Sequence, residues 1–377
     1  MSSKPAAAFR WLQTSDDAFA AMLDAIDAEA DSVRLEMYIF SAEAIGARFR
    51  DALVAACVRG VRVQVLIDAW GSIDLPDAFW IPLKKAGGEF RWFNPIRLNR
   101  FAIRNHRKSL ICGDKIAIVG GFNIAPEYEG DGVTRGWRDL GLSLTGPLAQ
   151  KLAENFDLLF ARADYRHPRF ARLRKSPLPN RLHTSTGDIL SGRPGRGRNV
   201  IKQSLAADFA HARRVQIIAS YFLPTWPMRR ALARVVRRGG QVQLLLAGHS
   251  DVPMAQLASQ RLYQSLLRAG IEIYEYQPQI LHAKLIVVDN TIYAGSANFD
   301  IRSLNINYEL LVRLPDATLA KEARSTFAKD LKHSERIDPA AWRKSRSFWR
   351  RIRERWAYFM FAHVDPYISR RQMCRPR

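Results

Sequence analysis

The sequence has little cysteine and no long apolar run, and both shortages narrow what the chain can be. Its three cysteines, Cys57, Cys112 and Cys374, are widely spaced and form no C-x-x-C pair, which argues against a zinc cluster or a disulfide framework. No stretch approaches the roughly 18 to 20 uncharged apolar residues of a membrane span. The first residues contain no apolar segment of a secretory signal. We therefore expect a cytoplasmic protein without a structural metal.

Acidic residues are also scarce, at 36 against 58 Lys and Arg, which gives a formal net charge of +22. A surface with this excess attracts polyanions, meaning nucleic acid or an anionic membrane. The length of 377 residues suggests two or three domains. The hydrophobic content of 47% is ordinary for a globular chain and excludes a mostly disordered one. Composition alone does not choose between the two kinds of polyanion.

Three blocks of sequence recur in the same order in the two halves of the chain, offset by roughly 180 residues, which indicates an internal duplication. The first block is an alternating, strand-like run at 32–40 and again at 214–223. The second is a helical segment that ends in Gly and leads into an apolar strand, at 46–68 and 227–247. The third is a helix end, a Gly and an alternating strand, read as KKAGGEFRWFNP and LRAGIEIYEYQP.

Each half therefore reads strand, helix, strand, helix, strand, which predicts right-handed crossovers and a mostly parallel sheet flanked by helices. We predict an α/β fold of two βαβαβ lobes related by a pseudo-twofold axis. Composition divides the chain into a first lobe at 9–165, a basic linker rich in Pro and Gly at 166–200, a second lobe at 201–330 and a basic, aromatic tail at 331–377.

The tail combines aromatic residues with many arginines. Phe348, Ile352, Trp356 and Phe359 recur at helical spacing, so we predict an amphipathic helix with an apolar face. A basic helix of this kind can lie among the headgroups of an anionic membrane. The alternative is a C-terminal helix that packs on the core and exposes its basic face to solvent.

Residues that can carry chemistry occupy matching positions in the two halves. His106 and Lys108 lie on one strand-like apolar run, and His282 and Lys284 lie on another. Side chains two apart on a strand share a face, so each His should project together with its Lys. Asp289 comes seven positions after His282 and has the opposite parity. We expect it to face away from the pair and to support it structurally.

Each pair is followed by small residues, then by an amide, then by a carboxylate. The small residues let backbone or substrate approach closely, and the amide can donate a hydrogen bond to an oxyanion. A carboxylate that accepts from a His N–H fixes the tautomer and raises the pKa of the imidazole. The positions concerned are Ser296 among the small residues, Asn123 and Asn298 for the amides, and Asp139 and Glu309 for the carboxylates.

Brought together across the pseudo-twofold axis, the two halves would surround one pocket with two His, two Lys and two Asn. One neutral His can attack a phosphodiester phosphorus, and the other, protonated, can give its proton to the leaving alcohol. The Lys and Asn side chains can stabilise the phosphoryl oxygens. Because the cations are built into the chain, we expect no metal and no other cofactor.

The duplicated pattern H-x-K-x4-D followed by G-[GS]-x-N resembles the signature of the phospholipase D superfamily. The second copy, LHAKLIVVDNTIYAGSANFDIRSLNINYE, is closely similar to that signature, and the resemblance runs from about Phe9 to Asp330. The first copy departs from it, because Gly113 stands where the Asp is expected and Asp114 follows. We predict that Asp114 takes over the supporting role or that local support is weaker. The alternative is a first half that has lost its catalytic function.

Several segments, among them EMYIF and GGFNIAPEY, look most like bacterial cardiolipin synthases of the short type without transmembrane helices. This resemblance implies transfer of a phosphatidyl group from phosphatidylglycerol to a second phospholipid or polyol hydroxyl. It implies His106 as nucleophile and His282 as acid and base, and sequence symmetry leaves the reverse order open. It also implies a peripheral enzyme on the inner face of a bacterial membrane, self-contained as a monomer. The alternatives are a phospholipase D hydrolase, a nuclease of the same fold, or a silent protein that binds lipid or nucleic acid.

Overall fold

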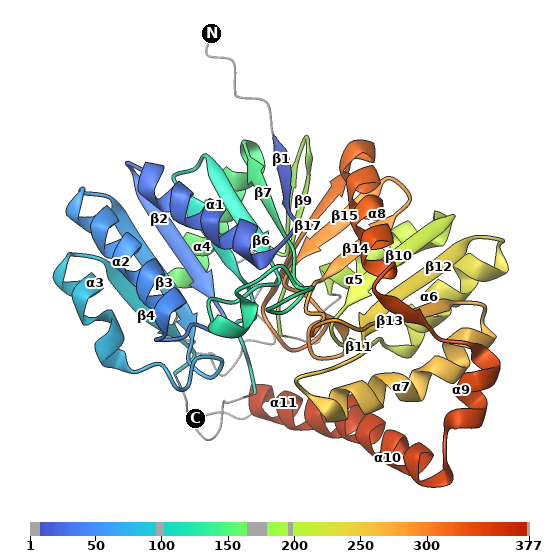
Figure 1. Ribbon diagram of the computed structural model, residues 1–377. Helices are drawn as coiled ribbons and strands as arrows, with labels where there is room; N and C mark the ends of the chain where they lie inside the picture. Colours follow the sequence, from blue (N-terminus) through green and yellow to red (C-terminus); the bar gives the residue numbers. More distant parts are fainter. Residues whose placement is uncertain (1–7, 96–101, 164–178, 195–198, 375–377) are drawn as a thin grey trace.

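The computed structural model describes residues 8–95, 102–163, 179–194 and 199–374. Two large sheets stand side by side, one from each half of the chain, and helices cover their faces (Figure 1). The order of elements in the first sheet and its helices recurs in the second. The two halves thus form the two α/β lobes that the duplication predicts.

The first sheet has seven strands in the order β1-β7-β6-β5-β2-β3-β4. These strands are β1 (Phe9–Leu12), β2 (Ser32–Met37), β3 (Arg62–Asp68), β4 (Glu89–Phe93), β5 (Ser109–Cys112), β6 (Ile116–Gly120) and β7 (Gly141–Thr145). The helices of this lobe are α1 (Ser15–Ala28), α2 (Ala44–Val58), α3 (Ile81–Lys85) and α4 (Pro147–Phe160), with short 3₁₀ turns η1 (Asp77–Trp80) and η2 (Pro126–Tyr128).

The second sheet has nine strands in the order β18-β13-β12-β10-β14-β15-β17-β9-β8. They are β8 (Arg181–Thr184), β9 (Gly187–Gly192), β10 (Arg214–Ala219), β12 (Gln241–Ala247), β13 (Glu272–Tyr276), β14 (Leu285–Val288), β15 (Thr291–Gly295), β17 (Glu309–Pro315) and β18 (Ser334–Arg336). A separate two-stranded ribbon pairs β11 (Phe222–Leu223) with β16 (Phe299–Asp300). The helices are α5 (Val200–His211), α6 (Trp226–Arg237), α7 (Pro253–Arg268) and α8 (Ala317–Leu331).

Both sheets are mixed, so the expectation of mostly parallel sheets holds only within each βαβαβ unit. Strands β2, β3 and β4 run parallel, as do β10, β12 and β13. The strands that follow the two His-Lys pairs are antiparallel to their neighbours. They form tight hairpins, β5–β6 and β14–β15, and a two-strand connection this short can only join antiparallel strands.

Local sequence accounts for the regular part of each lobe. Strands β3 and β12 are buried along nearly their whole length, which is why they read as continuous apolar runs rather than alternating ones. Helices α2 and α6 end just before Gly60 and Gly239, whose φ angles are 88° and 84°. This left-handed conformation closes a helix and favours glycine, as the two G-terminated segments predict.

Part of the predicted linker belongs to the second sheet. Residues 164–178 and 195–198 lie outside the described residues, but β8 and β9 fall within the range 166–200 that the composition assigned to a linker. Strand β9 pairs with β17, from Glu309↔Gly192 to Arg313↔Asp188. The boundary of the second lobe at residue 201 was therefore wrong. The Pro, Gly and Arg residues on both sides of this hairpin masked its short alternating strands.

The two lobes share one hydrophobic core. A single buried cluster includes Val119 and Leu142 of the first sheet together with Ile292 and Ala294 of the second, and β15 contacts both β6 and β7. Separate buried clusters lie on the outer side of each lobe. Because the shared core fixes the lobes against each other, side chains from both can form one rigid site at the seam.

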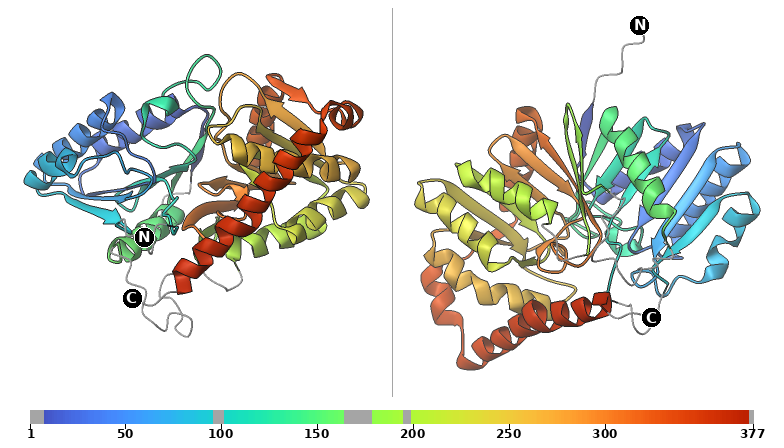
Figure 2. Two further views of the ribbon diagram at one scale, coloured as in Figure 1. Left: turned by 90° about the horizontal axis from the view of Figure 1, so that it is seen from below. Right: turned by 180° about the vertical axis from the view of Figure 1, so that it is seen from behind.

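The tail is helical, as predicted. It comprises α9 (Pro339–Ser345), α10 (Phe348–Phe359), a π-helical turn η3 (Met360–Val364) and α11 (Asp365–Cys374). The last three form one long helix that runs beneath the second lobe toward the first (Figure 2). Trp342 and Ala357 are buried against α7 and its neighbours. No helix in the described part of the chain is both long and apolar enough to cross a membrane.

Candidate active site at the seam of the lobes

The two His-Lys pairs lie in extended segments that lead into strands, not within the strands themselves. Lys108 immediately precedes β5, and Lys284 immediately precedes β14. The alternation predicted from the sequence nevertheless applies. Arg107, between His106 and Lys108, points away into the first lobe, where its Nε lies 3.1 Å from a Glu36 carboxylate oxygen.

Each His segment pairs with a segment of the opposite lobe. The backbone N–H of His106 donates to the carbonyl of Tyr308 at 2.9 Å, and that of His282 donates to the carbonyl of Arg138 at 2.8 Å. Isolated parallel bridges join Asn105 to Tyr308 and Arg138 to Leu281. The acceptors Tyr308 and Arg138 are followed directly by the predicted carboxylates Glu309 and Asp139. These bridges therefore place a carboxylate of one lobe beside the imidazole of the other.

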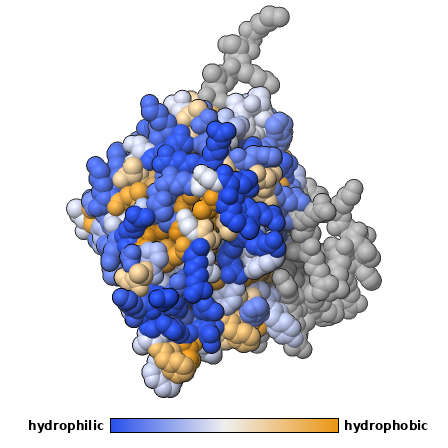
Figure 3. Space-filling model, turned by 90° about the vertical axis from the view of Figure 1, so that its right-hand side faces the viewer, coloured by the Kyte–Doolittle hydropathy of each residue, from blue (hydrophilic) through white to orange (hydrophobic). Residues whose placement is uncertain are grey.

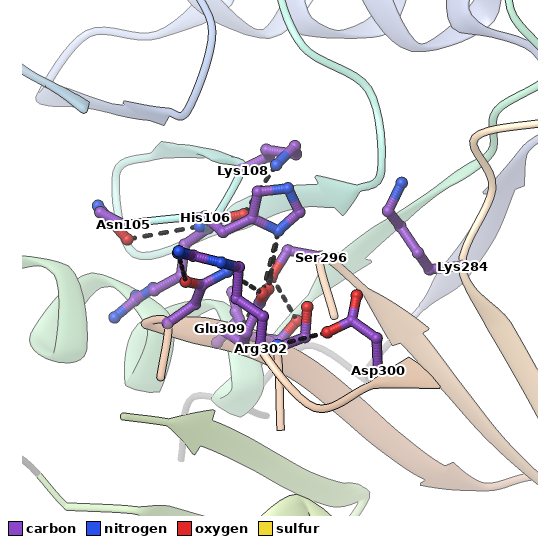
Figure 4. Close-up of polar contacts among 12 residues, drawn as sticks. Asn105, His106, Lys108, Lys284, Ser296, Asp300, Arg302 and Glu309 are labelled. Carbon is purple, nitrogen blue, oxygen red and sulfur yellow. Dashed lines mark hydrogen bonds and ion pairs between the residues drawn. The ribbon is translucent and has the colours of Figure 1, made fainter. Parts of the chain in front are cut away.

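The two predicted carboxylates bind the two imidazoles in this crossed arrangement. His106 Nδ1 lies 3.1 Å from Glu309 (Figure 4), and His282 Nδ1 lies 2.6 Å from Asp139. Ser296 also donates to Glu309, at 2.6 Å. A carboxylate at Nδ1 holds the proton on that nitrogen, so Nε2 of each ring carries the free lone pair. The crossing makes each half-site depend on both lobes.

The two lysines lie beside their own histidines. Lys108 Nζ donates to the carbonyl of His106 at 2.8 Å, and Lys284 Nζ donates to the carbonyl of His282 and lies 2.8 Å from His282 Nδ1. Burial and then the charge of Lys284 lower the pKa of Lys108. Each lysine keeps further N–H donors for a ligand, since an ammonium group has three. The two lysine side chains can therefore bind an anionic ligand.

Burial controls the protonation of this cluster. It lowers the pKa of both His106 and His282 to about 4, although Glu309 and Asp139 act to raise these values. The carboxylates raise the imidazole pKa as expected, but the desolvation of a charged imidazolium outweighs the paired charge. Burial also lowers the pKa of Lys108 to about 7. Both imidazoles are neutral at pH 7 when the site is empty.

The two asparagines play different parts. Asn123 accepts a hydrogen bond from the backbone N–H of Ile39 at 3.0 Å and donates to the Tyr128 hydroxyl at 2.7 Å, so its amide is largely engaged. The side-chain oxygen of Asn298 is buried and has no hydrogen-bond partner among the described residues. Of the two, Asn298 is the one with an open position for a ligand.

Aromatic side chains pack on both imidazoles. The ring of Tyr38 meets His106 edge-on at 4.8 Å between centroids. Tyr128 and Trp137 lie against His282 at 5.1 and 5.5 Å, and the Tyr128 hydroxyl is 3.4 Å from His282 Nε2. A tyrosine five residues after Asn123 is a common sequence feature, so only the fold could assign it to the site.

Asp289 supports the second half-site from the rear, as its parity predicts. It lies in the hairpin turn after β14, and its carboxylate accepts from the backbone N–H groups of Arg213 and Arg214 at 2.8 to 3.2 Å. Its own N–H donates to the carbonyl of Arg214 at 2.9 Å. The carboxylate thus anchors the His-Lys segment to the start of the central strand β10.

In the first half-site, Glu29 supplies the carboxylate that Gly113 lacks. It accepts from the backbone N–H groups of Asp31 and Ser32, at 2.8 and 3.3 Å, at the start of β2. The N–H of Gly113 donates to Ser32, as Asp289 donates to Arg214. A Cβ atom on Gly113 would lie 3.2 Å from the Glu29 carboxylate. Glu29 therefore anchors the first half-site as Asp289 anchors the second, but from the C-terminal end of helix α1.

The prediction that Asp114 replaces the missing carboxylate was therefore wrong. Its side chain is 62% exposed and lies 3.7 Å from Arg34 on the surface. It follows the turn residue, so it points out of the hairpin rather than back toward β2. No local pattern points to Glu29, because it lies far from Gly113 in the chain.

We expect Glu29→Ala to lower the free energy of unfolding by about 1–3 kcal/mol, because it leaves two backbone N–H groups without their charged acceptor. Gly113→Asp alone should also destabilise, because its carboxylate would crowd that of Glu29. In the Glu29→Ala background, Gly113→Asp should instead stabilise. Asp289, with a φ of 48° against 56° at Gly113, shows that aspartate fits this turn. Urea unfolding of the wild type and the three variants tests this, and additive effects would contradict it.

Among the described residues, no group of three or more His, Cys, Asp or Glu side chains is placed to hold a metal ion. The charges of the site come from Lys108 and Lys284. Two neutral imidazoles, two lysine side chains and the Asn298 amide come together at the seam of the lobes. This arrangement is suited to a phosphodiester, whose phosphorus accepts a nucleophile while its oxygens meet the cations.

Two such half-sites on a duplicated α/β fold define the phospholipase D superfamily as the class of protein. Comparison with known sequences agrees. The family described as "Cardiolipin synthase, PLD-like domain" matches residues 22–159 and 205–331. The chain therefore belongs to this family of phospholipase D-like enzymes.

Several curated relatives are cardiolipin synthases. The chain is 32% identical to Cardiolipin synthase 1 of Bacillus cereus over 357 residues, which cover 91% of this chain and 70% of the relative. It is 32% identical to the Major cardiolipin synthase ClsA of Bacillus subtilis, with 90% and 71% coverage. It is 28% identical to Cardiolipin synthase B of Salmonella typhimurium, with 95% and 88% coverage.

Solved structures share the fold at low sequence identity. The phosphatidylserine synthase of Haemophilus influenzae superposes with a TM-score of 0.72 at 15% identity and covers 96% of this chain and 94% of that one. Polyphosphate kinase of Porphyromonas gingivalis superposes with a TM-score of 0.59 at 16% identity, over 89% of this chain and 49% of that one. Both likenesses concern the two-lobe architecture alone.

Proposed function

We propose that this chain is a cardiolipin synthase-like phosphatidyltransferase, which transfers a phosphatidyl group from phosphatidylglycerol to the hydroxyl of a second phospholipid or of a polyol. Cardiolipin is the product when the acceptor is a second phosphatidylglycerol. The observation that carries the proposal is the crossed pair of His–carboxylate contacts, His106 with Glu309 and His282 with Asp139, between two lysines. The similarity to cardiolipin synthases over about nine-tenths of the chain supports the choice of substrate.

In the first step, Nε2 of one histidine attacks the phosphorus of phosphatidylglycerol. A P–N bond forms, the P–O bond to the headgroup glycerol breaks, and the other imidazole donates the proton that the glycerol oxygen takes up. In the second step, the acceptor hydroxyl gives its proton to that imidazole and its oxygen attacks the phosphorus, which breaks the P–N bond. One phosphodiester replaces another, so the exchange needs no nucleotide.

The electrostatics of the empty site fit the first half of this cycle. Burial holds the pKa of His106 at about 4, so the imidazole is neutral and nucleophilic at pH 7. The partner His282 must be protonated to act as an acid. A bound phosphodiester brings a negative charge into a buried site, and a nearby opposite charge favours the imidazolium. Substrate binding would therefore create the acid that the reaction needs.

We assign His106 as the nucleophile and His282 as the acid and base, following the family analogy. One structural difference accompanies this assignment. The Tyr128 hydroxyl lies 3.4 Å from Nε2 of His282, the atom that must exchange a proton. The ring of Tyr38, in contrast, packs edge-on against His106. Trapping the intermediate in acid and mapping the phosphorylated histidine identifies the nucleophile directly.

The test of the proposed function is product analysis after purified protein is incubated with phosphatidylglycerol vesicles. Cardiolipin and free glycerol in equal amounts are the expected products, with EDTA causing no loss of rate. Phosphatidic acid as the main product would show that the enzyme is a hydrolase and not a transferase. Cleavage of single-stranded DNA without any lipid product would point to a nuclease and overturn the proposal.

We also propose that the enzyme works on the inner surface of a bacterial membrane, held there by the tail. Five aromatic residues of the tail helix are more than half exposed, namely Phe348, Trp349, Trp356, Phe359 and Tyr367, at 71%, 72%, 56%, 54% and 62%. Figure 3 shows apolar residues at the lower edge of the molecule among charged ones. Packing of the other face on α7 does not compete with this role, because the helix uses separate faces for the two contacts.

We expect the triple variant Trp349→Ser, Trp356→Ser, Phe359→Ser to bind anionic vesicles at least about tenfold more weakly. Burying one large apolar side chain contributes about 1.5–3 kcal/mol, and 1.4 kcal/mol is tenfold in affinity. Trp226→Ser is the matched control, because Trp226 is 58% exposed but lies on α6. Co-sedimentation with phosphatidylglycerol vesicles measures the effect. Equal binding of all three proteins would leave the tail with a packing role only.

A further inference from the structure

A half-open groove lies between the C-terminal helix and the second lobe, beside the catalytic residues but distinct from them. Its cavity volume is about 150 Å³, and it is partly open to solvent. Three parts of the chain form its walls: the β11–β16 ribbon, the start of α7, and the turn from η3 into α11. Its apolar lining comprises Phe222, Leu223, Val252, Ala255, Ile301 and Phe361.

The polar end of the groove adjoins the active site. Asp300 lines the groove and follows Asn298 by two residues. Figure 4 places the Asp300 side chain between Arg302 and Lys284, and its charge acts on Lys284. A molecule held in the groove would therefore reach the catalytic pocket with one end while its other end lies among apolar side chains.

An ion pair holds the tail helix in place as the outer wall. The Arg302 guanidinium binds both oxygens of Asp365, at 2.8 and 3.2 Å, and also donates to the carbonyl of Ala102 in the first lobe at 2.8 Å. The same helix exposes Trp356 and Phe359 on its outer face. The wall of the groove is thus continuous with the surface that we propose to rest on the membrane.

The groove belongs to one half-site only. In the duplicated motif, GSANFD of the second lobe aligns with GGFNIA of the first, so the position of Asp300 is occupied by Ala125. The tail helix packs on the second lobe through α7. The active site is symmetric in its histidines and lysines, but its surroundings are not, as a reaction that joins two differently oriented lipids requires.

We propose that this groove binds the glycerol and acyl part of a phospholipid whose phosphodiester lies at the two His-Lys pairs. The inference deepens the proposed function and rests on it. An apolar trough with one polar end fits an amphipathic lipid.

The first test fills the groove with Ala255→Trp and compares two substrates. One is long-chain phosphatidylglycerol, and the other is bis(4-nitrophenyl) phosphate, which has no acyl chain. The ratio of the two kcat/KM values should fall at least tenfold in Ala255→Trp, because only the lipid needs the groove. Ala207→Trp, on the exposed face of α5, is the matched control and should keep the wild-type ratio. An unchanged ratio in Ala255→Trp overturns the proposal.

The second test does not depend on turnover or on how Ala255→Trp folds. Wild-type protein is irradiated with phosphatidylglycerol that carries a diazirine in one acyl chain, and the labelled peptides are mapped. Labels on 252–255 and on Phe361 support the groove, whereas labels confined to Trp349, Trp356 and other outward-facing tail residues overturn it. Labelling of the groove by a protein that releases no glycerol would refute the proposed transfer reaction and still support lipid binding here.

Discussion

Replacing His282 with Ala should reduce the turnover of phosphatidylglycerol by at least about 10³-fold, and His106→Ala should do the same. General acid–base catalysis alone contributes about 10²–10⁴-fold, and the loss of either imidazole also interrupts the covalent step. Both residues are buried, His106 at 8% and His282 at 4% exposure. Initial rates of glycerol release measure the loss.

His183→Ala is the control for these variants. His183 also pairs with a carboxylate, Asp188, at 2.8 Å, but its side chain is 79% exposed on the β8–β9 hairpin. Its removal should leave the rate within twofold of the wild type. If either active-site variant retains more than a few per cent of the activity, a mechanism with two catalytic histidines is wrong. Full activity in His106→Ala alone would single out the first half-site as silent.

The crossed carboxylates give the second large effect. We expect Asp139→Asn and Glu309→Gln each to lower kcat by about 10²-fold with little change in KM, because an amide no longer fixes the Nδ1 proton or stabilises the imidazolium. Neither side chain contacts the substrate in the proposed mechanism, so both are positioning residues. Rates at saturating lipid, measured beside vesicle binding, separate this effect from weaker binding.

The crossing itself has a spectroscopic signature. In ¹⁵N–¹H spectra of the imidazoles, Asp139→Asn should shift the resonances of His282 in the second lobe, and Glu309→Gln should shift those of His106 in the first. A general structural disturbance would instead shift the resonances of both imidazoles or of neither. If Asp139→Asn shifted His106 and left His282 unchanged, the carboxylates would serve their own lobes, and the arrangement described here would be wrong.

Much of the site could be predicted from the sequence because its chemistry repeats. The candidate residues occur at matching positions of the two halves, so each copy supports the interpretation of the other. They are the two His-Lys pairs, Asn123 and Asn298, and the two carboxylates. The alternation of side chains along an extended segment was enough to predict that Arg107 and Asp289 face away from the His-Lys pairs. These inferences depend only on spacing within short stretches of chain, which local backbone geometry determines.

Other features could not be predicted, because they depend on residues that meet only after folding. The sequence suggested Asp114 as the substitute for the missing carboxylate, whereas Glu29, more than eighty positions away from Gly113, provides it. The same reasoning placed 181–192 in a linker, whereas pairing with β17 makes these residues strands. In both cases, the partner is distant in the chain and carries no local signal.

The sequence by itself determined the duplicated α/β lobes, the candidate catalytic side chains and the amphipathic character of the tail, because these follow from periodicity, spacing and charge. Only the tertiary structure decided that Asp139 serves His282 and Glu309 serves His106, and that the tail helix closes a groove through Arg302 and Asp365. These contacts arise where the two lobes share a core, and the packing of one lobe against the other sets which side chains come within hydrogen-bonding distance.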